Sequence, residues 1–407
     1  MKQTSIWLSL LLLLAPACVQ SQPWKFTKPI AISSNHGEKI FHHLESSGRH
    51  NIAISADTVA VAWEDNRDGT PRIYLARKGR NSKVFLDSIK ISGAGEAYEP
   101  SLVALSNNQF VLSWEEDARI HLRLVTPSKL GPVITLAASE AAQPSLTYFD
   151  SQLLLVYARR DNRYSRIWMQ DIEVDGQELH LKKACVVDSD PPQNEQSYPS
   201  IIKLPDRKIV AWEDRRLGHT IIMAAQSDKK KSCRFHSPQR ISDALPNRTA
   251  KYGTGHGVSR VALAQFGAGK VLAAWADKRD FREGYNIYAA HYQPNGKQLF
   301  TPNIKVQDSF GDVAQQWHTT VAGDQSGRLV VGWDDKRDGD ANIMLSWLEG
   351  NNWSEDLAVP GADGPGEQNH PTISIDQEGN LHLAWVERTT INGPSQLRYL
   401  FGRLNKE

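Results

Sequence analysis

One pattern returns along the whole chain and limits its fold more than any other feature. An apolar run ends in Trp and is followed by an acidic pair, an Arg and often a Gly, before a second apolar run begins with Ile. The clearest copy is 59–69, followed by 73–76. The seven copies, with Tyr in the third, are anchored at Trp63, Trp114, Tyr157, Trp212, Trp275, Trp333 and Trp385. Repeats of about 40 to 65 residues built from short β-type runs are typical of propeller blades.

Each copy divides into four short strands, A to D. Strand A is expected to begin at a proline in four copies, because proline suits the first residue of a strand: Pro100, Pro144, Pro199 and Pro371. The seventh copy lacks a strand D, whereas residues 24–33 resemble one. We therefore predict an all-β fold, a seven-bladed β-propeller with four antiparallel strands per blade. The N-terminal strand closes the ring and removes an open sheet edge.

The N-terminus has the pattern of an export signal. Residues 1–17 contain Lys2, an apolar run and the small residues before a cleavage point, which predicts a signal peptide followed by one propeller domain over 18–407. Residues 14–18 resemble a bacterial lipobox that would lipidate Cys18, although Pro16 is unusual there. The expected location is the periplasm or outer membrane with a lipid anchor. Plain secretion stays open as the alternative.

Charge limits the kinds of binding partner that this chain can have, and the cysteine content limits its possible disulfides. The chain has 47 Lys and Arg against 46 Asp and Glu, a net charge of +1, which argues against a nucleic-acid binder. Membrane contact is expected only through the N-terminal lipid, and the protein is expected to be a monomer. If Cys18 carries lipid, Cys185 and Cys233 remain, and an exported compartment permits a disulfide between them. Two unpaired buried thiols are the alternative.

The motif of Trp, an acid, Asp, any residue, Arg, any residue and Gly before an Ile-Tyr strand resembles the sialidase-like, BNR-type propellers of bacterial envelopes. The resemblance covers nearly all of 18–407 and implies the propeller fold. Sialidase activity is not implied, because the chain has no Arg-Ile-Pro segment. Only 374–376 with Gly379 partly matches the Asp-box pattern.

The repeated Asp and Arg after the anchors have two interpretations. They could surround a ligand. A residue that recurs in the same place in several blades is better explained as one that stabilises its own turn. We expect Asp65 to accept backbone N–H bonds and Arg67 to pair with it or to stack on Trp63, with the same arrangement in later copies. The anchors themselves are expected to pack between blades. A Ca²⁺ site could use Asp334, Asp335, Asp338 and Asp340, although their spacing matches no recognised loop.

Functional residues are expected where the copies differ, just before each strand A, because these positions line the mouth of the central channel. Histidines concentrate there, opposite phenols and amides. The candidate catalytic residues are His256, His318 and Tyr198, because imidazole and phenol can move protons. The candidate binding residues are Arg49, His50, Tyr98, Gln143, Arg260, Trp317 and His370.

This set predicts recognition of an acidic glycan at the mouth, and cleavage by a polysaccharide lyase or a glycoside hydrolase is open. An Arg can hold a carboxylate while His and Tyr move protons, as in some propeller lyases. No cofactor is assigned; the same imidazoles could bind a transition metal. The alternative function is a non-catalytic scaffold that holds another envelope protein, with the histidines as ordinary hydrogen-bonding loop residues.

Overall fold

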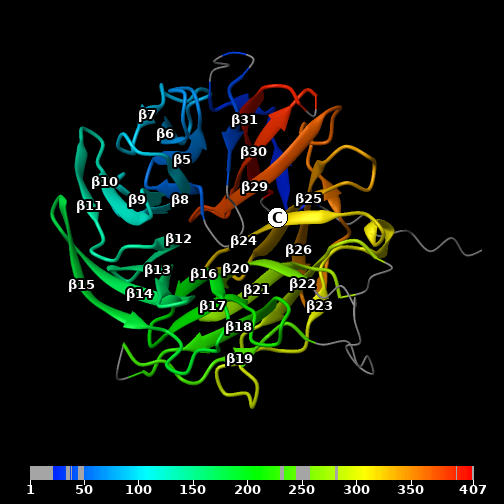
Figure 1. The fold of residues 1–407 in the computed structure, drawn as a ribbon. Coiled ribbons are helices and arrows are strands. Elements are labelled where there is room, and N and C mark those ends of the chain that lie inside the picture. The colour runs from blue at the N-terminus through cyan, green and yellow to red at the C-terminus, as the bar shows by residue number, and fades with distance from the viewer. Residues whose placement is uncertain are drawn as a thin grey trace, which may run out of the picture.

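The computed structural model describes residues 22–33, 37, 39–44, 50–229, 233–243, 257–279, 283–390 and 392–405. Their strands form seven antiparallel sheets, which Figure 1 shows arranged around a central axis. The predicted all-β, seven-bladed propeller is therefore confirmed. No helix in the described part of the chain is long and apolar enough to cross a membrane.

Strand A lies innermost in every blade, and the A strands of neighbouring blades contact one another around the ring. They are β3 (His42–His43) with β4 (Ile52–Ser55), β8 (Ala97–Ala104), β12 (Ala141–Phe149), β16 (Gln196–Lys203), β20 (Val258–Phe266), β24 (Gln316–Gly323) and β29 (Glu367–Ile375). The B strands end just after the anchors and are β5 (Thr58–Asp65), β9 (Phe110–Glu116), β13 (Gln152–Asp161), β17 (Lys208–Asp214), β21 (Lys270–Asp277), β25 (Leu329–Asp335) and β30 (Leu381–Arg388).

The C strands follow the turns that contain the repeated Arg. They are β6 (Arg72–Gly79), β10 (Arg119–Val125), β14 (Tyr164–Asp175), β18 (Ile221–Gln226), β22 (Asn286–His291), β26 (Asn342–Glu349) and β31 (Ser395–Leu404). The outer strands are β7 (Ile89–Lys90), β11 (Leu130–Thr135), β15 (Glu178–Val186), β19 (Gln239–Arg240), β23 (Ile304–Lys305), β27 (Asn352–Trp353) with β28 (Leu357–Ala358), and β1 (Trp24–Phe26) with β2 (Ile30–Ala31). The described residues include one 3-10 turn, η1, at Ser309–Gly311.

The N-terminal strands complete the last blade, as predicted. Trp24 pairs with Leu404, and Ile30 pairs with Tyr399 on the same strand β31. Segments from the two ends of the chain therefore share one sheet. This pairing covers the edge of β31 that would otherwise be open.

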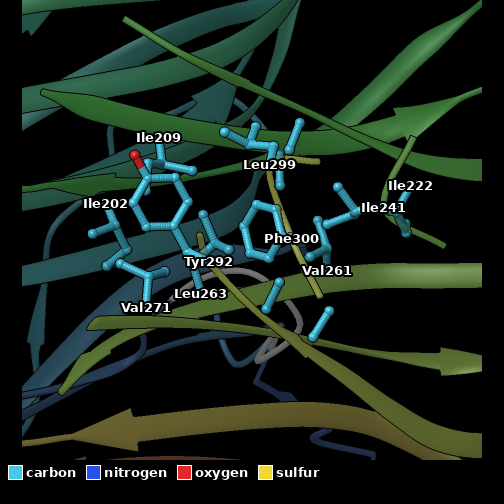
Figure 2. Close-up of a cluster of buried hydrophobic side chains, with 14 of the residues drawn as sticks. Ile202, Ile209, Ile222, Ile241, Val261, Leu263, Val271, Tyr292, Leu299 and Phe300 are labelled. Carbon is cyan, nitrogen blue, oxygen red and sulfur yellow. The ribbon is translucent and has the colours of Figure 1, made fainter. Parts of the chain in front are cut away.

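The core consists of seven hydrophobic clusters, one at each boundary between consecutive blades. Figure 2 shows the cluster between blades 4 and 5, where Ile202 and Ile209 meet Val261, Leu263 and Val271. The six anchor Trp side chains are 0% exposed and Tyr157 is 1% exposed. Each anchor packs against the preceding blade, which confirms their predicted place in the core.

The repeated Asp and Arg are structural, as expected. Asp65 is 1% exposed and accepts the Trp63 indole N–H at 2.8 Å and the Arg67 backbone N–H at 3.1 Å. The same contacts recur around Asp214 and Asp335. Arg67 pairs with Asp65, as expected, and its guanidinium lies 4.0 Å from the centre of the Tyr74 ring and 5.8 Å from that of Trp63. Tyr74 lies across from Trp63 on strand C and presents its face to the turn.

The predicted start of strand A was wrong. Strand β8 begins at Ala97, before Pro100, and β29 begins at Glu367, before Pro371. The prolines lie inside the strands, next to a break in pairing register. A bulge removes a ladder hydrogen bond, so a residue without an N–H fits there.

Cys185 and Cys233 are joined by a disulfide, with their Cα atoms 5.5 Å apart. It links strand β15 of blade 3 to the segment that precedes β19 of blade 4. The cross-link therefore adds to the apolar contacts between these two blades.

Candidate functional site

Six of the seven A strands contain the same backbone irregularity near their first residues. The pairing register with strand B shifts there by one residue, which marks a β-bulge. In each bulge a residue other than glycine has a φ between 48° and 58°. These six residues, which we call the mouth belt, are Glu99, Gln143, Tyr198, Arg260, His318 and His370. Left-handed non-glycine residues are strained, and such strain concentrates at functional sites.

In three blades the residue that follows the anchor holds the bulge of the next blade. Because side chains alternate along a strand, this residue faces away from its neighbouring Trp. Glu115 accepts the backbone N–H of Gln143 at 2.7 Å, and Glu213 accepts that of Arg260 at 2.7 Å. Asp334 in the same position accepts the N–H of His370 at 3.0 Å. Carboxylates of the preceding blades therefore fix the backbone of the belt at these three positions.

Blade 3 achieves the same contact with a different residue. Its anchor is followed by Ala158, which offers no acceptor. The Gln143 side chain instead accepts the backbone N–H of Tyr198 at 2.8 Å. A belt residue of one blade thus positions the belt residue of the next.

One side of the mouth combines a phenol with a guanidinium. The Arg260 guanidinium lies 3.6 Å from the centre of the Tyr198 ring, a cation–π contact between blades 5 and 4. Gln143 and Tyr198 also line a cavity of about 330 Å³ together with Glu195, Glu213 and Arg215. This sector can donate hydrogen bonds and attract a carboxylate while one aromatic face stays packed.

The other side of the mouth is a cluster of imidazoles. The rings of His318 and His370 are 3.8 Å apart, and His43 lies 4.7 Å from His370. His318 Nδ1 is 2.6 Å from Asp334 Oδ2, and Asp334 is almost fully buried. A carboxylate on Nδ1 favours the tautomer with the proton there, which leaves Nε2 as a proton acceptor. Asp334 thus contacts two belt histidines at once.

Burial keeps the central histidine neutral. Desolvation lowers the pKa of His370 well below its usual range, and the neighbouring charges of His318 and His43 act in the same direction. His370 Nδ1 is buried without a hydrogen-bond partner in the described part of the chain. A neutral imidazole between two others limits the positive charge that the cluster can hold.

Five predicted residues take other places or fall outside the described residues. Tyr98 donates its hydroxyl to Glu96 at 2.8 Å, and the neighbouring Glu99 occupies the belt position. Trp317 packs against Tyr285, with ring centres 3.9 Å apart. Arg49, His256 and Cys18 lie outside the described residues.

His50 lies deeper than predicted. It lines a central cavity of about 230 Å³ with residues of the A strands of blades 1, 2, 3 and 7. Burial lowers its pKa. His50 is therefore a channel residue below the belt, and its neighbours there include Thr147 and Tyr148.

The candidate Ca²⁺ ligands do not converge. Asp334 binds the two histidines, whereas Asp335 bonds Trp333 and Arg337, and Asp340 accepts the N–H of Gly366. Consecutive strand residues point to opposite faces, so Asp334 and Asp335 cannot share an ion. Among the described residues no group of three or more His, Cys, Asp or Glu could hold a metal.

Sequence reasoning placed His43 among the histidines near the mouth but did not select it for the site, and it missed the acids that hold the bulges. The signal for the acids was present, because an acid follows four of the seven anchors, namely Glu64, Glu115, Glu213 and Asp334, whereas Ala158, Ala276 and Val386 follow the others. The Asp one residue later recurs more strictly, so a structural role was assigned to that Asp and none to the acid before it. His43 is separated from its neighbour His370 by most of the chain, and only ring closure brings them together.

Comparison with protein-family models finds no match, and comparison with curated proteins finds none either. Solved structures do match. The polysaccharide lyase Uly1 has a TM-score of 0.58 at 11% identity, over 88% of this chain and 90% of its own. A Dyadobacter fermentans DSM 18053 protein of unknown function has a TM-score of 0.53 at 10% identity, over 94% and 100%.

An α-L-arabinanase of Penicillium chrysogenum complexed with arabinobiose has a TM-score of 0.49 at 10% identity, over 74% of this chain and 92% of its own. At such identities a likeness shows the fold alone. The assignment to sialidase-like propellers stays a prediction. The chain shares its β-propeller fold with proteins that include a polysaccharide lyase.

Proposed function

We propose that the mouth belt binds an acidic glycan and cleaves it by elimination. The observation that carries this proposal is the non-glycine left-handed residue at the same point of six A strands, which directs six different side chains to one mouth. Each strained backbone position has a cost of about 1 to 3 kcal/mol, which a fold retains where the geometry serves a site. A polysaccharide lyase shares the fold and makes this chemistry the first to test.

The proposed roles follow from the contacts. Arg260, stacked on Tyr198, binds the carboxylate of a uronate. His318 Nε2, with its tautomer held by Asp334, removes the proton from the carbon next to that carboxylate. The electron pair forms a carbon–carbon double bond as the bond to the leaving glycosidic oxygen breaks. That oxygen takes the hydroxyl proton of Tyr198, which solvent then restores.

The test uses purified protein and a panel of uronate polysaccharides. Turnover appears as ultraviolet absorbance of an unsaturated uronate, and binding appears as retardation in an affinity gel. We expect His318→Gln to lower turnover by about 100-fold or more with binding retained, as for loss of a general base. Arg260→Gln should weaken binding and turnover together. The control is His180→Gln, because His180 lies on the outer strand β15 and is half exposed.

Three outcomes separate the possibilities. Turnover lost in His318→Gln and kept in His180→Gln supports the lyase. Binding without any turnover in wild type limits the mouth to recognition. If no acidic polysaccharide binds, or if His318→Gln equals wild type, the proposal is wrong.

A second candidate function is a scaffold for another envelope protein. It is favoured by two exposed apolar side chains in the connection between β23 and β24, on the mouth face: Phe310 is 81% exposed and Val313 is 82% exposed. Exposed apolar groups near a mouth suit a protein contact. A double variant Phe310→Ser, Val313→Ser that loses a partner in cross-linking while glycan binding is kept would support this function.

We further propose that the protein is exported and anchored at Cys18. Metabolic labelling with a fatty acid should tag the wild type and not Cys18→Ser. Label on neither protein would support plain secretion.

A further inference from the structure

The junction where the ring closes contains a cavity far from the mouth belt. It has a volume of about 510 Å³ and lies between three segments. These are the N-terminal residues around Lys28, the turn after β6 that contains Arg80 and Lys83, and the end of β31 at Arg403. We call it the closure groove. It exists only because both ends of the chain share blade 7 and blade 1 packs beside it.

The residues that line the closure groove carry charge of one sign. Five of them are cationic, namely Lys28, Lys78, Arg80, Lys83 and Arg403. None of the lining residues is a carboxylate, while Asn81, Ser82 and Tyr399 add neutral polar groups. On a chain whose net charge is only +1, such a concentration is local.

Lys78 is the least ordinary of the five. It is 3% exposed, and its ammonium donates to the carbonyls of Gly79 at 3.1 Å and Arg80 at 2.9 Å. It lies 5.1 Å from the centre of the Tyr399 ring. No carboxylate pairs with it among the described residues. An ammonium has three donors, the two carbonyls take two of them, and Lys78 lines the cavity.

A buried cation without a counter-ion is costly, and folds usually pair or replace it. Desolvation lowers the pKa of Lys78 to about 8, so it stays mostly charged at neutral pH. Arg80 contacts two carboxylates outside the lining, Glu378 at 2.6 Å and Asp376 at 3.9 Å, and its Nε is buried without a hydrogen-bond partner among the described residues. The groove therefore keeps hydrogen-bond donors, and the positive charge of Lys78, that the described residues do not satisfy.

We propose that the closure groove binds a ligand that carries phosphate or sulfate groups. A tetrahedral oxyanion accepts several hydrogen bonds at once and neutralises more than one cation, which a single carboxylate does less well. The volume exceeds that of one phosphate and suits a sugar phosphate, a sulfated sugar or a lipid headgroup. The shared chemistry is the multiply charged oxyanion, and the groove is separate from the proposed glycan mouth.

The test is calorimetric titration of the full chain with inorganic pyrophosphate at constant ionic strength. Wild type should bind saturably at one site. Lys78→Met keeps the stem and removes the charge, and Arg403→Gln changes an exposed residue of the groove that the fold does not need. Each should weaken binding by about tenfold, the effect of one strong charged hydrogen bond. Lys297→Gln is the control, because Lys297 is exposed on the corresponding turn of blade 5.

Vesicle sedimentation identifies the source of the oxyanion. Binding to phosphatidylglycerol vesicles but not to phosphatidylcholine vesicles, with competition by pyrophosphate, assigns a headgroup. Pyrophosphate binding without vesicle binding assigns a soluble ligand. The proposal is overturned if neither probe binds wild type, or if Lys78→Met and Arg403→Gln bind as tightly as Lys297→Gln. Circular dichroism melts of all variants establish that each is folded.

Discussion

Replacing Trp24 by Ala should test whether the closing strand stabilises the whole ring. Trp24 is 2% exposed, packs edge-on against Trp347 with ring centres 6.2 Å apart, and donates its indole N–H to Gly379 at 2.8 Å. Truncating a buried aromatic residue to Ala costs about 3 to 5 kcal/mol. The Gly379 carbonyl also loses its donor, which adds about 1 kcal/mol. We expect the free energy of unfolding to fall by about 4 to 6 kcal/mol, the sum of those two costs.

The assay is urea unfolding followed by far-ultraviolet circular dichroism, because fluorescence would change with the number of Trp residues. Trp353→Ala is the matched control. Trp353 is only half-buried, lies in the outer strand β27, and its indole N–H has no acceptor among the described residues. Trp353→Ala should therefore lower the free energy of unfolding much less than Trp24→Ala. If Trp24→Ala stays within about 1 kcal/mol of wild type, or costs no more than Trp353→Ala, closure does not stabilise the ring as argued.

Three further outcomes are expected. Asp65→Ala should lower the free energy of unfolding by about 3 to 5 kcal/mol in denaturant melts, because Arg67 and the Trp63 indole lose a buried partner; glycan binding should be unchanged. Reducing the Cys185–Cys233 bond, which spans 48 residues, should lower the free energy of unfolding by at most about 4 kcal/mol and should lower the melting temperature of the wild-type protein. Lys78→Met should stabilise the protein by about 2 to 3 kcal/mol at pH 7. Since the folded pKa of about 8 lies below the ordinary 10.5, that gain should shrink as pH rises from 8 to 10.5.

The propeller fold could be predicted from the sequence because the residues that determine it recur in every blade or nearly so. An apolar run that ends in Trp fixes strand B, and the Asp two residues later captures the indole N–H, so local sequence and packing agree in most blades. The strand D resemblance of residues 24–33 sufficed to predict closure. The position of the prolines was misread, because a bulge inside a strand and the start of a strand place proline in equally acceptable surroundings.

The site was predictable only in outline. Gln143, Tyr198, Arg260, His318 and His370 were placed at the mouth from the strand register, and they do lie in the belt. Their partners were not predictable, since Asp334 looked like one more turn residue. The approach of His318, His370 and His43 joins blades 6, 7 and 1. No local pattern encodes that contact, because it depends on how far the closed ring turns.

The way the bulges are held has a consequence for how such a protein changes over generations. The carboxylate of the preceding blade captures a backbone N–H, as Glu115 does with Gln143, and any amino acid except proline supplies that group. Where a carboxylate holds the bulge, that contact does not depend on which side chain is displayed, whereas at Gln143 the side chain itself holds Tyr198. The six positions already carry acid, amide, phenol, guanidinium and imidazole groups. Single substitutions at these belt positions can therefore change the specificity of the mouth while the propeller fold stays the same.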